Sequence, residues 1–215
     1  VSFGKRWAEG YKRAWEAGEP DAAGGAPTKA GVALVDVLTG KDAVIGILAA
    51  LRARDHSGKG QLIEVNLLSS LLASLVNQAS ALLATGIEPT RMGNAHPSIA
   101  PYETLTAADG DFAVAVGNDA IFARLCAVVG RSELAGDERF ATNAARMEHR
   151  DELAAELEAA FAGARADDWV ARLGEAGVPA GPINDIAQAF AFAAGLGLEP
   201  VDETDGVRTV RSPLR

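Results

Sequence analysis

Apolar residues recur at helical spacing in several parts of the chain. The apolar positions of 41–54 share one face of a predicted helix. The longer apolar stretch 67–85 predicts another helix, which ends at Gly86 because glycine is favoured just after a helix C-terminus. The apolar positions of the first helix are Val44, Ile45, Leu48 and Leu51. The same spacing predicts helices over 118–129 with Asn118 as its cap, 148–161, 167–174 and 186–194.

Short apolar or alternating segments between these helices predict strands. The segment 61–65 alternates between apolar and polar residues, and 32–35 is a short extended run. A turn at Asp109-Gly110 joins two further predicted strands, and Asp205-Gly206 is the centre of a strand pair in the tail. The strands joined by the first turn are 102–106 and 112–116, and another extended run covers 178–184.

Composition limits the classes of partner. The chain has 215 residues and a net charge of −9, and its acids are spread along the sequence. No basic face for nucleic acid is therefore expected. Cys126 is the single cysteine, which excludes an internal disulfide and a cysteine-based zinc site. It lies in a helical pattern, so we expect it to be buried as a small hydrophobic residue.

The first 17 residues carry an aromatic stripe with basic residues between its members. We expect a helix that packs this stripe on the body of the protein, and the alternative is a helix that binds a membrane surface or a partner. The sequence has no signal-peptide pattern and no run of membrane-spanning length, which favours a cytoplasmic protein. The stripe is formed by Phe3, Trp7, Tyr11 and Trp15.

Several polar patterns have an ordinary structural interpretation. Gly58-Lys59-Gly60 lacks the spacing of a phosphate-binding loop and predicts a helix-terminating turn. Asp167 and Asp168 fit the first turn of a helix. No His/Asp/Glu group has the spacing of metal ligands. The residues expected on solvated surfaces are His56, His149, Glu152, Glu156 and Glu158.

One carboxylate, Asp36, lies within an apolar run. Such an acid is paired, solvated through a cleft, or used in chemistry. The residues alone favour a helix cap or a buried partner over catalysis.

Three segments, in order, resemble the class III CoA-transferases (the CaiB/BaiF family). The first is 31–65, where Gly31, Asp36 and Gly40 match the context of the family's nucleophilic aspartate. The second is RMGNAHPSIAPY, and the third is VPAGPIN. The resemblance covers 18–215 and is strongest to the branch that moves CoA between dicarboxylic acids.

The resemblance implies an α/β, helix-rich fold, with part of a Rossmann-like CoA-transferase lobe and a small α+β domain. Residues 1–90 would be a remnant of the large CoA-binding and catalytic lobe. Residues 91–185 would form the small domain, which begins with the Gly-Asn-Ala-His-Pro loop, and 186–215 would return toward the large lobe. We expect a chain truncated at both ends relative to the family, whose members form interlocked homodimers.

The resemblance also implies a chemistry. Asp36 would attack an acyl-CoA thioester and pass CoA to a carboxylic acid through anhydride and aspartyl-CoA thioester intermediates, without a metal. Gly93, Asn94, His96 and Pro97 would form an active-site loop over it, with donors for a carboxylate or oxyanion. From the residues alone, His96 is instead a loop-structuring histidine. The CoA-contacting residues stay unassigned, because the family's lie mostly upstream.

Two other functions stay open. An α-methylacyl-CoA racemase needs two acid/base groups, and the residues before Asp36 contain no histidine to supply one. The chain could also be a non-catalytic fragment or an assembly module.

Overall fold

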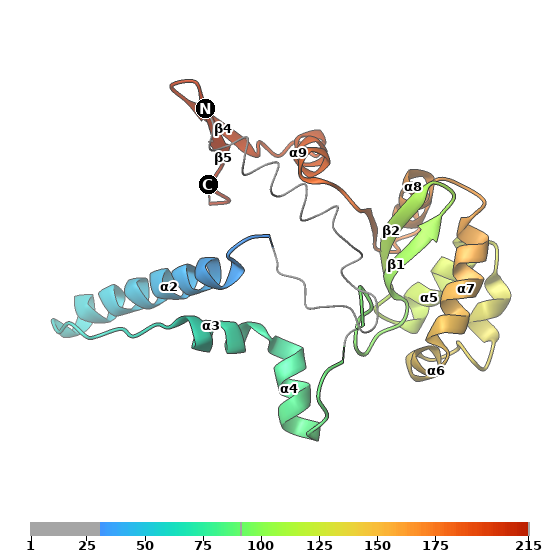
Figure 1. Ribbon diagram of the computed structural model, residues 1–215, viewed down its shortest axis with the longest axis horizontal. Helices are drawn as coiled ribbons and strands as arrows, with labels where there is room; N and C mark the ends of the chain where they lie inside the picture. Colours follow the sequence, from blue (N-terminus) through green and yellow to red (C-terminus); the bar gives the residue numbers. More distant parts are fainter. Residues whose placement is uncertain (1–30, 91, 215) are drawn as a thin grey trace. The chain divides into compact units, whose positions relative to one another are not determined.

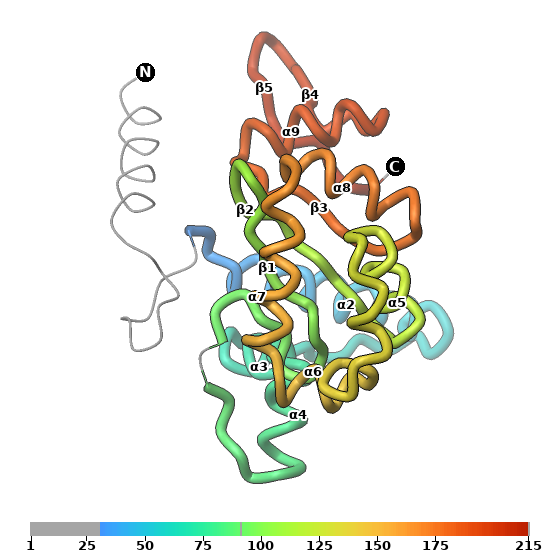
Figure 2. The backbone as a smooth tube through the Cα atoms, turned by 90° about the vertical axis from the view of Figure 1, so that its right-hand side faces the viewer, coloured from blue at the N-terminus to red at the C-terminus, as the bar shows by residue number. Residues whose placement is uncertain are grey.

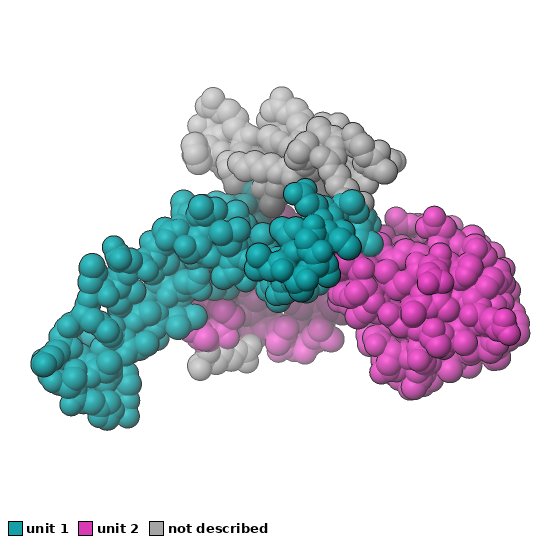
Figure 3. Space-filling view, turned by 90° about the horizontal axis from the view of Figure 1, so that it is seen from below, with its two compact units in different colours: residues 1–93 teal, residues 94–215 magenta. Residues whose placement is uncertain are grey.

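The structure is a computed structural model that describes residues 31–90 and 92–214. The aromatic stripe of residues 3–15 and the loop expected over 18–27 lie outside the described residues. The chain divides into two compact units between Gly93 and Asn94, coloured separately in Figure 3. We call the N-terminal part unit 1 and the C-terminal part unit 2.

Unit 1 begins with the long helix α2 (Leu34–Ser57), which includes the predicted helix 41–54. The extended run predicted over 32–35 is wrong, because helical hydrogen bonding already starts at the amide of Val37, which donates to the carbonyl of Ala33. The helix ends at Gly58, whose φ of 69° is left-handed and whose amide donates to the carbonyl of Arg54. This confirms the helix-terminating turn.

The apolar stretch 67–85 forms two helices rather than the single predicted one. These are α3 (Leu67–Ser74) and α4 (Val76–Thr85), and they are bent by 80° at the break. Val76 has a φ of 41°, which no continuous helix allows. The Ser74 hydroxyl donates to the carbonyl of Ser70 just before the break, a bond that competes with regular helix geometry. Gly86 ends α4 as predicted, with a φ of 72°.

The strand predicted over 61–65 is also wrong. A strand exists only through hydrogen bonds to a neighbour, and the described part of unit 1 contains no strand with which this segment could pair. The segment instead approaches α2, where a Cβ atom on Gly46 would lie 3.0 Å from the Cγ2 atom of Ile63. Glycine at this position therefore allows a close approach.

Helices α2 and α3 are joined by a hydrogen bond of 2.6 Å from the hydroxyl of Ser70 to the carboxylate of Asp42. Ser70 is buried, but no residue of α2 is. The apolar face that the helical spacing predicted for α2 is therefore uncovered. Its four residues are Val44, Ile45, Leu48 and Leu51, with exposed fractions of 55%, 65%, 61% and 40%.

Unit 2 contains an antiparallel sheet with the order β1-β2-β3. Strands β1 (Tyr102–Ala107) and β2 (Gly110–Ala115) form a tight hairpin in which Ala107 pairs with Gly110. Strand β3 (Ala180–Pro182) pairs with β2 through Phe112, Ala113 and Val114. The predicted strands 102–106 and 112–116 are confirmed, as is an extended segment within 178–184.

Helices pack against this sheet. Helix α7 (Arg150–Phe161) contacts β1, as Figures 1 and 2 show, and α8 (Ala166–Glu175) contacts β2 and β3. Asn118 caps α5 (Asp119–Val128) as predicted, because its side chain accepts a hydrogen bond from the amide of Ile121. The sequence did not predict the 3-10 helix η1 (Ser132–Gly136) or helix α6 (Asn143–Glu148).

The core of unit 2 lies between the sheet and the helices. Phe161 makes edge-to-face contacts with Phe112 at 4.9 Å and with Trp169 at 5.3 Å between ring centroids. The indole N–H of Trp169 donates to the carbonyl of Phe161, so the ring is buried without an unpaired donor. Cys126 belongs to the same core and is fully buried, as predicted.

The C-terminal part of unit 2 contains α9 (Ile186–Gly195) and a hairpin of β4 (Val201–Thr204) and β5 (Val207–Val210). The hairpin turns at Asp205-Gly206, which confirms the predicted strand pair. Asp185 and Gln188 form a capping box at the start of α9. The described residues thus form a helix-rich α/β structure with small antiparallel sheets, as predicted.

Across residues 31–90 and 92–214, no single helix has both the length and the apolarity needed to cross a membrane. The bent pair α3 and α4 passes that test only when its two helices are taken together.

Candidate active site

Asp36 lies in the first turn of α2 and its side chain is exposed. The sequence placed it before the helix; it is inside, because α2 starts at Leu34. It is not the N-cap, since that position is Ala33 and no side chain caps the helix. Neither structural role favoured by the residues alone, a cap or a buried acid, is therefore observed. An exposed carboxylate in the first turn lies at the positive end of the helix dipole, and a carboxylate can act as a nucleophile.

The predicted active-site loop starts with Gly93, whose φ of 57° favours glycine. The side-chain amide of Asn94 donates to the hydroxyl of Thr104 at 3.3 Å. Asn94 is exposed and Pro97 is half-buried. One amide hydrogen of Asn94 takes part in this bond, so its second hydrogen is available to another acceptor.

His96 is held from several directions. Its backbone amide donates to the carbonyl of Tyr102 at 2.8 Å, and its ring stacks on the Tyr102 ring with centroids 5.0 Å apart. The backbone amide of Ser98 donates to Nδ1 of the imidazole at 3.1 Å. Because an amide can only donate, Nδ1 is the acceptor and the ring proton is on Nε2. His96 is thus both a loop-structuring residue and an oriented hydrogen-bond donor.

Three side chains from α6 and the start of α7 bind the main chain of this loop. Asn143 donates to the carbonyl of Ser98 at 2.9 Å and accepts from the amide of Ala100 at 3.1 Å. Arg146 donates through Nε to the carbonyl of Ala100 at 2.7 Å. We call Asn143, Arg146 and Arg150 the loop clamp, and the sequence analysis did not predict it. Asn143, Arg146 and Arg150 are separated by three and four residues, which is the spacing of one helical face and the signal that could have revealed it.

Arg150 is the third member of the loop clamp. Its Nη2 atom donates to the carbonyls of His96 at 2.7 Å and Ile99 at 2.9 Å. Nη1 lies 3.8 Å from the nearer carboxylate oxygen of Glu103, too far for a hydrogen bond. Nε and Nη1 are buried without an acceptor among the described residues. Burial raises the pKa of Glu103 above its usual value, and the positive charge of Arg150 opposes this shift only in part.

The acids of α7 are more engaged than predicted. Glu152 pairs with Arg139 at 2.9 Å and Glu156 with Arg131 at 2.8 Å. Glu158 accepts a hydrogen bond from the amide of Thr106. Glu152 is exposed, as predicted, whereas Glu156 and Glu158 are half-buried, and each acid has a partner from another segment of unit 2.

The other polar predictions have mixed outcomes. Asp167 and Asp168 lie in the first turn of α8, as predicted. His56 is exposed, as predicted. His149 is only half-buried and its Nδ1 atom lies 2.9 Å from the Glu152 carboxylate, so it is a paired surface residue.

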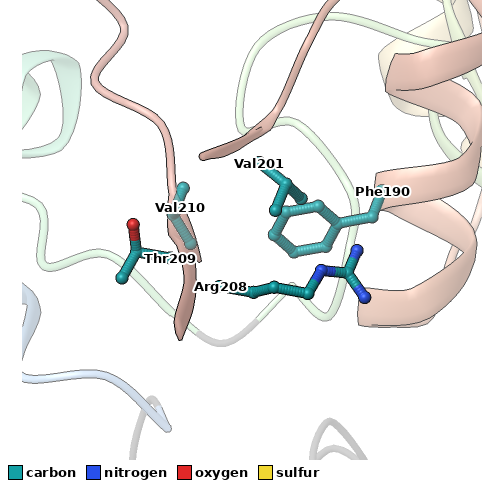
Figure 4. Close-up of a pocket in the computed structure, with 5 residues that line it drawn as sticks. All are labelled: Phe190, Val201, Arg208, Thr209 and Val210. Atoms are coloured by element: carbon teal, nitrogen blue, oxygen red, sulfur yellow. The ribbon is translucent and has the colours of Figure 1, made fainter. Parts of the chain in front are cut away.

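An open hollow between α9 and the β4–β5 hairpin is lined by Phe190, Val201, Arg208, Thr209 and Val210 (Figure 4). It holds one cation and a hydroxyl but no general base, so it offers no means to activate a nucleophile. Within residues 31–90 and 92–214, no three His, Cys, Asp or Glu side chains converge as metal ligands.

Comparison with known proteins gives one family. The sequence model of CoA-transferase family III matches residues 14–215. The succinate–glutarate CoA-transferase of Agrobacterium fabrum is 44% identical over 92% of this chain and 52% of its own length. The acetyl-CoA:oxalate CoA-transferase of Acetobacter aceti is 38% identical over 92% of this chain and 50% of its own. The chain spans about half the length of these curated relatives.

Solved structures of similar proteins support the same family. The crystal structure of a CaiB/BaiF family protein from Brucella suis has a TM-score of 0.72 and 46% identity, and the match covers 92% of this chain and 52% of that one. A protein from Mycobacterium tuberculosis is 26% identical with a TM-score of 0.77, over 94% of this chain and 54% of its own.

Proposed function

Because the chain belongs to CoA-transferase family III, we propose that it carries the nucleophile for transfer of CoA from an acyl-CoA to a dicarboxylic acid. The observation that carries this proposal is the exposed carboxylate of Asp36 in the first turn of α2, within the matched region. The names of the relatives from Agrobacterium fabrum and Acetobacter aceti support a dicarboxylate as the acceptor.

The proposed reaction starts when a carboxylate oxygen of Asp36 attacks the thioester carbonyl of the acyl-CoA. A carbon–oxygen bond forms, the carbon–sulfur bond breaks, and CoA leaves as a thiolate. The thiolate then attacks the aspartyl carbonyl of the mixed anhydride. This step releases the donor acid as a carboxylate and leaves an aspartyl-CoA thioester.

The acceptor acid repeats these steps in reverse order. Its carboxylate attacks the aspartyl thioester, forms a second anhydride and expels the thiolate. Attack of the thiolate on the acceptor's acyl carbonyl gives the new acyl-CoA and regenerates the Asp36 carboxylate. Every bond broken is matched by one formed, so the cycle needs no oxidant or reductant.

We assign the loop a supporting role in this cycle. Asn94 and the Nε2–H group of His96 would donate hydrogen bonds to the oxyanion that develops at each attacked carbonyl. Gly93 and Pro97 would shape a cover that keeps water from hydrolysing the anhydride and the thioester. The fixed ring of His96 supports this assignment, because a donor that is already oriented needs no reorganisation during the reaction.

The Asp36→Ala variant tests the nucleophile directly. With succinyl-CoA and glutarate as substrates, we expect transfer to fall by roughly a thousandfold or more, as for removal of a covalent nucleophile. Asp55→Ala is the matched control, since Asp55 is an exposed aspartate at the other end of α2, and it should retain the wild-type rate. Equal turnover in the two variants would refute the role of Asp36.

We also propose that the protein acts as a cytoplasmic homodimer. The uncovered apolar face of α2 supports association, because exposed apolar surface of this extent typically marks an interface. Light scattering of the purified chain should give twice the chain mass of 22.2 kDa, and a monomer at all concentrations would contradict the dimer.

A further inference from the structure

Two buried arginines hold the same loop in different ways. Arg146 is fully buried, and its three guanidinium nitrogens donate to the carbonyl of Ala100, the carbonyl of Phe140 and the carboxylate of Asp119. Each nitrogen thus has an acceptor, and this is the arrangement expected of a residue that serves stability.

Arg150 differs. One nitrogen, Nη2, joins two loop carbonyls, while Nε and Nη1 have no acceptor among the described residues. Buried donors without hydrogen-bond partners are unfavourable, and the Glu103 carboxylate lies 3.8 Å from Nη1, beyond hydrogen-bond distance. The side chain instead spans the turn from His96 to Ile99. In this position Arg150 fixes the loop main chain, while two of its own donors, Nε and Nη1, remain without acceptors among the described residues.

The hydrogen bonds of Arg150 help to fix the position of the His96 imidazole. Arg150 holds the His96 carbonyl, the carbonyl of Tyr102 holds the His96 amide, and the amide of Ser98 holds Nδ1. The Ser98 amide that donates to Nδ1 lies between the two carbonyls that Arg150 holds, those of His96 and Ile99. Asn143 holds the Ser98 carbonyl on the other side of that residue, so Arg150 is the side chain that fixes the part of the turn containing His96.

We propose that Arg150 is a positioning residue for CoA transfer, which acts by fixing the His96–Ile99 turn so that His96 presents Nε2–H as its hydrogen-bond donor. The catalytic part of this inference rests on the proposed function. Arg150 itself touches no reacting atom in this scheme.

Nitrogen-15 NMR of the full chain tests the geometric part without an activity assay. The chain has three histidines, so His96→Gln identifies the signals of His96. In the wild type we expect Nδ1 to be unprotonated and Nε2 to carry the proton. In Arg150→Gln the ¹⁵N chemical shifts of Nδ1 and Nε2 of His96 should move toward each other, because a mixture of the two tautomers averages them. Arg165→Gln is the matched control, because Arg165 is a 68% exposed arginine of unit 2 that pairs with Asp109.

Kinetics test the catalytic part. We expect Arg150→Gln to lower kcat roughly 10- to 100-fold, as displacement of an oriented group does, with the KM for acyl-CoA changed less than about threefold. Arg150→Lys keeps the charge but lacks the planar fork, so it should restore only part of kcat. A residue needed merely for stability would change neither the tautomer nor kcat in folded protein.

A second pair of variants keeps the test decisive if the Arg150 variants do not fold. Tyr102 is 43% exposed and stacks on His96. Tyr102→Leu removes the stacking and should shift the His96 signals and lower kcat, whereas Tyr102→Phe keeps the ring and should change neither.

Each outcome separates the two proposals. Unchanged His96 signals and kcat in Arg150→Gln, or in Tyr102→Leu where that variant is used, overturn the positioning inference. A wild-type chain that folds but transfers no CoA overturns the proposed function and the catalytic role of Arg150 with it. The NMR comparison then still decides whether Arg150 sets the His96 ring.

Discussion

Arg146 combines a buried charge with a stacking contact. Its guanidinium lies 4.4 Å from the centroid of the Phe122 ring and is otherwise surrounded by hydrogen-bond acceptors. We expect Arg146→Met to lower the free energy of unfolding by about 3 kcal/mol, because two buried carbonyls lose their donor. Urea unfolding followed by tryptophan fluorescence measures this. Arg139→Met is the control, as that side chain is 42% exposed, and a loss of the same size there would contradict the assignment.

Cys126 should be chemically inert in the folded protein. Burial raises the pKa of its thiol to about 11, and its exposed fraction is 0%. Because the thiolate is the reactive form, we expect iodoacetamide at pH 8 to label the chain only after urea is added. Rapid labelling of folded chain would show that the helix α5 opens or that the thiol is exposed.

The buried carboxyl group of Glu103 should make the free energy of unfolding depend on pH. Its folded-state pKa is raised, chiefly by burial, so the folded chain holds this proton more tightly than the unfolded chain does. The contribution to stability is therefore present below the unfolded pKa and is lost as pH rises through the folded pKa. We expect the wild type to gain stability relative to Glu103→Gln as pH falls from 8 toward the ordinary pKa of 4.5, measured by urea unfolding. A gain in the opposite direction would mean that the ion pair with Arg150 outweighs burial.

At the scale of elements, sequence periodicity predicted β1, β2, α5, α7 and α8 well, because each has a face that the core of unit 2 covers. It failed where no neighbour is present. The segment 61–65 alternates like a strand but has no partner, and 67–85 is apolar like one helix but breaks at Val76. Helix α6 was missed because its six residues are too few to show an apolar face.

The Asn118 cap should contribute measurably to the stability of helix α5. Asn118 accepts a hydrogen bond of 2.9 Å from the amide of Ile121 at the start of α5. Asn118→Ala should lower the free energy of unfolding by about 1 kcal/mol, and Asn118→Asp should restore most of it. Urea unfolding of both variants distinguishes the cap from a general effect of substitution, since loss of stability in the Asp variant as well would argue against capping.

At the scale of the whole molecule, the two units differ in how they bury apolar residues. The core cluster of buried residues lies entirely in unit 2, whereas α2 contains no buried residue. At concentrations low enough to keep the chain monomeric, amides of β1, β2 and α7 should therefore exchange more slowly than those of α2 and α4 in hydrogen-exchange mass spectrometry. Equal protection in the monomeric chain would contradict this difference between the units.

The candidate site was predicted only in part. Asp36 and the Gly93–Pro97 loop were proposed from the resemblance, while local patterns alone favoured structural roles. The loop clamp was missed because its contacts join residues far apart in the sequence: Asn143 and Ser98 are separated by 45 residues, and Arg150 and His96 by 54. The spacing of Asn143, Arg146 and Arg150 indicates a shared face, but the segment that this face contacts depends on the folding of the whole unit.

The most direct test of the account is to trap the enzyme-bound intermediate. The folded chain is incubated with succinyl-CoA, treated with hydroxylamine or borohydride, and analysed by intact mass and peptide mapping. We expect a single modification on the peptide that contains Asp36, absent from Asp36→Ala and present in Asp55→Ala. A folded chain that binds CoA but carries no modification at Asp36 would contradict the account.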